Sequence, residues 1–105
     1  MSAAIHDLSA IGAGFGEPVM ASQAVFRHSI SALSRPGAIL NVTSDAQAPR
    51  GVEPAANALL LALLDQDTRL WLSPALAKGS AGAYLRFHTG CSLASEPATA
   101  DFALA

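Results

Sequence analysis

The chain has 105 residues, of which 51% are hydrophobic and 13% are charged. This is the composition of one globular domain, or of a piece of one, and it excludes the charge-rich class of disordered chains. The formal net charge of -2 and the six scattered Lys and Arg residues predict neither a nucleic acid nor a membrane as partner. Cys91 is the only cysteine, which excludes an intrachain disulfide and favours a cytoplasmic location.

Residues 1–17 show no sustained periodicity and predict an irregular N-terminal arm, followed by a partial α/β domain over residues 18–105. The arm contains Gly12, Gly14 and Gly16, which superficially resemble a phosphate-binding loop. No strand is predicted before these glycines, and no Lys-Ser or Lys-Thr pair follows them. We therefore interpret them as residues that permit an irregular backbone.

The spacing of apolar residues predicts a first helix over residues 22–33, with Ser22 as its N-cap. The stripe expected to be buried consists of Phe26, Ile30 and Leu33, with Val25 and Ser29 beside it. Arg27 and His28 then face away from the deepest burial. The helix has to end before Pro36 and Gly37, because proline disfavours helical geometry at the preceding residue and glycine supplies the positive φ of a type II turn.

The middle of the chain predicts a strand, a loop, a second helix and a second strand. Residues 38–42 are apolar and β-branched enough for a strand, and residues 43–52 are rich in loop-forming residues. Pro54 suits the first position of a helix over residues 54–64, which is apolar nearly all round and is expected to be buried on both sides. Residues 69–72 predict an interior strand of a sheet that is covered on both faces.

Asp65 and Asp67 lie between the second helix and the second strand. Two carboxylates in this position could ligate a magnesium ion or form an acid and base pair. A turn in which the side chains bond nearby backbone groups is the commoner use of such a sequence, and we favour it.

The last third of the chain predicts a further helix and a final strand. Residues 75–82 form either a mobile connection or a poor helix. Residues 83–90 have helical spacing, with Gly90 as a natural stop, although a strand remains an alternative. A loop over residues 94–97 then leads to an alternating strand over residues 99–104. This order of elements predicts a layered α/β sheet with flanking helices.

The densest polar cluster contains Arg86, His88 and Cys91. A guanidinium suits phosphate, and an imidazole near the C-terminal end of a helix is stabilised as a cation. Capping or ion pairing by Arg86 and His88 is the favoured interpretation, and Cys91 is expected to be inert packing. The three histidines at positions 6, 28 and 88 are too dispersed to indicate a metal site.

Three separated motifs occur in a recognisable order. They are Phe26-Arg27 followed by Ala32, Ser34, Pro36 and Gly37; residues 59–68 with Leu70-Trp71-Leu72-Ser73; and residues 85–90 with Ala100-Asp101-Phe102-Ala103. Together they closely resemble the PhnH family, the H subunits of the bacterial carbon-phosphorus lyase system. The resemblance spans residues 23–104 and corresponds to the N-terminal half of a family chain.

This resemblance implies phosphonate catabolism in the bacterial cytoplasm, within a core complex that helps to form ribose 1-phosphonate 5-triphosphate from ATP and a phosphonate. It implies a fold similar to the large domain of pyridoxal-phosphate-dependent transferases, without that cofactor. The only lysine, Lys78, lies in a Gly/Ser-rich connection, in agreement with the absence of a Schiff base. Other core subunits and, for a full-length chain, a second copy are the expected partners.

Three hypotheses about function remain open from the sequence. The first is an accessory subunit of the core complex with no catalytic residue of its own. The second is a module that binds a phosphorylated ligand through Arg27, Arg86 and His88. The third is an inactive, truncated fragment, because the sequence stops at Ala105 within an alternating apolar pattern and would leave the edges of the sheet uncovered.

Overall fold

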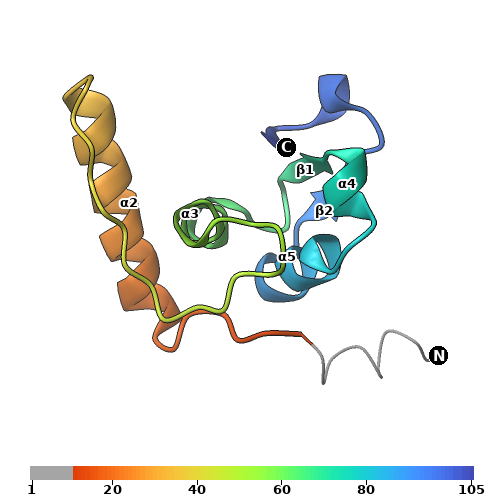
Figure 1. The fold of residues 1–105 in the computed structure, drawn as a ribbon, viewed down its shortest axis with the longest axis horizontal. Helices are drawn as coiled ribbons and strands as arrows, with labels where there is room; N and C mark the ends of the chain where they lie inside the picture. Colours follow the sequence, from red (N-terminus) through yellow and green to blue (C-terminus); the bar gives the residue numbers. More distant parts are fainter. Residues whose placement is uncertain (1–10) are drawn as a thin grey trace.

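The computed structural model describes residues 11–105, so residues 1–10 of the predicted arm lie outside the described residues. The architecture is α/β, as predicted, with a small sheet and helices beside it (Figure 1). The elements in chain order are α2 (Pro18–Ser34), α3 (Pro54–Leu63), β1 (Arg69–Leu72), α4 (Pro74–Ala77), α5 (Ala81–Thr89), β2 (Ser92–Leu93), the 3-10 helix η2 (Pro97–Thr99) and β3 (Phe102–Leu104).

The sheet has three strands in the order β2-β1-β3, and both pairings are parallel. Leu70 at the centre of β1 pairs with Leu93 on one side and with Phe102 on the other. Asp101 fixes the start of β3, because its carboxylate accepts the N–H of Arg69 at 2.9 Å while its own N–H donates to the carbonyl of Arg69 at 2.8 Å. The predicted interior position of residues 69–72 is confirmed.

The hydrophobic core lies between β1, α3 and α5. Leu70 and Leu72 alternate along β1 toward this core, and Leu85 of α5 is fully buried. The remaining buried members of the core are Val52, Leu60, Leu64, Ala81, Tyr84 and Cys91. Trp71, on the other face of β1, is only half-buried. Coverage of the sheet on both faces, expected from the sequence, is therefore complete on one face only.

Helix α3 begins at Pro54, as predicted, because proline at the first helical position gives up an N–H that has no partner within the helix. It ends at Leu63, since Leu64 has an extended backbone with φ -78° and ψ 145°. The helix lies between α2 and α5 (Figure 1), which places apolar neighbours on two of its sides. Asn57, Ala58 and Leu60 are buried, but Ala55 and Leu59 remain exposed, so the burial on both sides expected from the composition of α3 is incomplete.

Helix α2 corrects the predicted burial of the first helix. It starts at Pro18 and not at Ser22, and its one buried residue is Val25. Phe26, Ile30 and Leu33, the stripe predicted to be buried, are exposed. The reason is that α3 faces the side of α2 that carries Ser29 and Ala32, with Leu33 at the edge of the groove between the helices. Phe26 and Ile30 lie outside that contact and stay exposed.

Residues 38–42 also differ from the prediction, because they are extended but form no strand. This segment runs back beside α2 (Figure 1), far from the strands of the sheet. Leu40 and Val42 turn toward the groove between α2 and α3, while Ile39 points outward and is exposed. The β-branched and apolar residues thus favour an extended backbone, but no strand lies beside the segment to form the backbone hydrogen bonds of a sheet.

Helix α5 confirms the helical interpretation of residues 83–90 and excludes the strand alternative. Gly90 ends it with φ 75°, a left-handed conformation that glycine adopts at no steric cost. The preceding connection contains the single turn of α4, and the predicted final strand is shortened to β3 because η2 occupies residues 97–99. Within residues 11–105, every helix is too short or too polar to cross a membrane.

Candidate functional site

The N-terminal segment of residues 11–16 is held against α5 and the loop before α3. The carbonyl of Ala13 accepts the hydroxyl of Tyr84 at 2.9 Å and the N–H of Gln47 at 2.8 Å. The carbonyl of Gly12 lies 2.8 Å from Nε2 of His88, so this nitrogen carries the proton and donates. The bonds of Tyr84 and His88 join this short segment to residues more than 70 positions away in the sequence.

Side chains packed closely against this segment explain why it contains glycines. A Cβ atom on Gly12 would lie 3.1 Å from the side chain of Gln47, and one on Gly14 would lie 2.8 Å from Nδ1 of His88. The N–H of Gly16 donates to both carboxylate oxygens of Asp45, at 3.1 and 3.0 Å. Close approach, and not a left-handed backbone, therefore accounts for Gly12 and Gly14, because the described glycines with positive φ are Gly37, Gly51 and Gly90. The N–H of Gly16 is bonded to Asp45 and is not free to bind a phosphate.

Beneath this segment, Tyr84 and Asn57 form a buried polar contact. Both are 1% exposed, and the amide Nδ2 of Asn57 donates to the hydroxyl of Tyr84 at 3.1 Å. Oδ1 of Asn57 is buried and has no partner among the described residues. The ring of Tyr84 packs edge-on against His88, with centroids 4.6 Å apart. Tyr84 therefore connects α3, α5 and the N-terminal segment.

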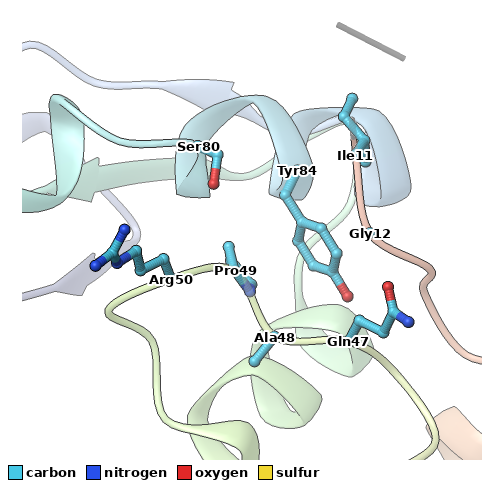
Figure 2. A pocket seen from close by; sticks show the side chains of 8 residues that line it. All are labelled: Ile11, Gly12, Gln47, Ala48, Pro49, Arg50, Ser80 and Tyr84. Atoms are coloured by element: carbon cyan, nitrogen blue, oxygen red, sulfur yellow. The ribbon is translucent and has the colours of Figure 1, made fainter. Parts of the chain in front are cut away.

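A cavity of about 230 Å³ lies between the N-terminal segment, α5 and residues 47–50. Figure 2 shows the hydroxyl of Tyr84 directed toward the side of the cavity that carries Gln47, while Arg50 extends away from Tyr84. The remaining lining residues are Ile11, Gly12, Ala48, Pro49 and Ser80. The hydroxyl of Tyr84 and Oε1 of Gln47 are already bonded to the backbone of Ala13, which leaves the guanidinium of Arg50 as the lining group suited to a small anion.

The three residues predicted to bind a ligand lie at different places. Arg86 is exposed in the last turn of α5, and His88 in the same turn is half-buried against Gly12. Residues two apart do not face each other on a helix. Arg27 is exposed on α2, and α3 lies between α2 and α5 (Figure 1). The described structure therefore does not gather the three side chains into one cluster.

The acidic turn is built as the favoured interpretation predicted. The carboxylate of Asp65 accepts the N–H of Asp67 at 2.8 Å, and the hydroxyl of Thr68 donates to the carbonyl of Asp65 at 2.8 Å. Cys91 is buried in the core, as expected for inert packing. Within residues 11–105, no three His, Cys, Asp or Glu side chains lie close enough together to hold a metal ion.

Asn57 and Tyr84 were missed as polar residues of interest. Asn57 is the only polar residue of α3, whose sequence is otherwise alanine, leucine and the first proline. A single amide in such an apolar helix signals a buried hydrogen bond. Its partner Tyr84 lies 27 residues away, and no local pattern identifies a contact over that separation.

Comparisons of the sequence with known proteins agree with the resemblance carried by the three sequence motifs. A model of the family described as "Bacterial phosphonate metabolism protein (PhnH)" matches residues 13–105. The chain belongs to the PhnH family. The match begins at Ala13, whose carbonyl accepts the hydroxyl of Tyr84, so residues 13–16 of the N-terminal segment lie within it, while Gly12, which His88 contacts, lies just before it.

A curated PhnH relative gives the family a biochemical setting. The chain is 43% identical over 76 residues to the alpha-D-ribose 1-methylphosphonate 5-triphosphate synthase subunit PhnH of Rhizobium meliloti (strain 1021). The match covers 72% of this chain but 38% of the relative. The resemblance to PhnH and the assignment to phosphonate metabolism, both expected from the sequence, are confirmed.

Proposed function

We propose that this PhnH-family chain is a subunit of the bacterial carbon-phosphorus lyase core complex in the cytoplasm. In this proposal it supports the formation of ribose 1-phosphonate 5-triphosphate from ATP and a phosphonate, as an accessory subunit. The observation that carries the proposal is the 43% identity to a subunit of a ribose 1-methylphosphonate 5-triphosphate synthase. The proposal includes a full-length fold similar to the large domain of pyridoxal-phosphate-dependent transferases.

The polar residues around α5 are engaged in hydrogen bonds within the chain, which supports an accessory role. His88 and Tyr84, the two side chains of α5 best suited to proton transfer, each donate to a carbonyl of the chain's own N-terminal segment. Asn57 is likewise engaged with Tyr84 inside the core. These groups stabilise the fold, and the proposal assigns the chemistry to other core subunits. A homodimer of the full-length chain belongs to the same proposal.

Co-expression with the other core subunits tests this function. A tag on this chain should retain the other subunits in stoichiometric amounts through affinity and size-exclusion steps, and the purified assembly should convert ATP and methylphosphonate into the triphosphate product. An assembly that forms and turns over equally well without this chain would contradict the proposal. The matched control is a tagged, unrelated α/β domain of the same size, which should retain none of the subunits.

A second proposal is that the end of α5 contacts a phosphorylated ligand. The exposed guanidinium of Arg86 in the last turn of α5 favours it. His88 lies in the same turn but would have to release its bond to Gly12 to take part. A charge-assisted hydrogen bond contributes about 1.5–3 kcal/mol, so loss of the Arg86 contact should weaken binding about 10- to 100-fold. Arg27, on α2, would have to contact a different part of the ligand or a second molecule.

Calorimetric titration with ATP distinguishes binding at the end of α5 from binding in the cavity. Binding that is lost in Arg86→Ala and kept in Arg50→Ala supports the second proposal, because Arg50 lines the cavity and is also an exposed arginine. Loss of ATP binding in Arg50→Ala alone would indicate that the ligand binds in the cavity beside Tyr84. Titration of Arg27→Ala then shows whether the α2 residue takes any part.

A further inference from the structure

We draw no further inference here: the strongest candidate, the cavity of about 230 Å³ that Arg50, Ser80 and Tyr84 line between α5, the N-terminal segment and residues 47–50, belongs to the site already described, and the single exposed guanidinium of Arg50 does not by itself identify a ligand.

Discussion

Helices α5 and α2 differ in how many of their residues are buried. α5 is nine residues long and has four buried residues, whereas α2 is seventeen residues long and has one. α5 also binds the N-terminal segment through Tyr84 and His88. The difference shows that an apolar pattern identifies which face of a helix can be covered, while only the rest of the assembly determines which face is covered.

The largest expected effect is the difference in stability lost when one leucine of each helix is truncated to alanine. Leu85→Ala in α5 should lower the free energy of unfolding by about 2–5 kcal/mol, because the side chain is fully buried and its removal leaves a cavity. Leu33→Ala in α2 should change it by less than about 0.5 kcal/mol, because the side chain is exposed. Urea unfolding followed by the fluorescence of Trp71 measures both. Equal losses would contradict the described burial.

The second prediction concerns the buried polar contact that joins α3 to α5. Tyr84→Phe removes the hydroxyl that pairs with Ala13 and Asn57, and it should cost about 1–3 kcal/mol because the buried amide loses its partner. Adding Asn57→Leu should recover part of that loss, since a buried apolar group needs no partner. The same urea unfolding measures both variants. A double variant less stable than the sum of the two single losses would contradict this pairing.

The third prediction concerns the contact between the N-terminal segment and His88. Gly14→Ala should cost about 1–3 kcal/mol by overpacking, because the added Cβ would lie 2.8 Å from Nδ1 of His88. Gly79→Ala is the matched control: its Cβ would meet nothing closer than 3.8 Å, so the change should be neutral or slightly stabilising. Hydrogen exchange of the Gln47 amide, which donates to Ala13, should accelerate in the first variant only. Equal exchange in both would show that this segment is not held by close packing.

The smallest expected effect lies in the turn that precedes β1. Asp65→Ala should lower the free energy of unfolding by about 0.5–1.5 kcal/mol, because its carboxylate accepts the N–H of Asp67. Asp67→Ala should change it by less than about 0.5 kcal/mol, since Asp67 takes part in this bond through its backbone. Thermal unfolding of the two variants in parallel measures the difference, and a larger loss for Asp67→Ala would argue against the turn as described.

Local patterns in the sequence were sufficient for the elements around the core. Pro54 and Gly90 mark a helix start and a helix end through their own backbone preferences. The Asp65 turn, likewise, closes within four residues. In all three cases the deciding interaction lies close to the residue that predicts it.

The remaining features depend on contacts that no local pattern contains. Tyr84 reaches Ala13 across 71 positions and His88 reaches Gly12 across 76. The extended segment at residues 38–42 had the composition of a strand, but strand formation needs a neighbour that lies elsewhere in the chain. For the candidate site, the sequence predicted the titratable residues of α5 but not that one of them holds the N-terminal segment.

Hydrogen–deuterium exchange of the chain, alone and within the assembled synthase, tests most directly whether α2 presents an open contact face while α5 belongs to a completed core. The account predicts that the amides of Pro18–Ser34 become protected by at least about 10-fold on assembly, while those of Ala81–Thr89 change little. Unchanged exchange in α2, with new protection confined to α5, would contradict it.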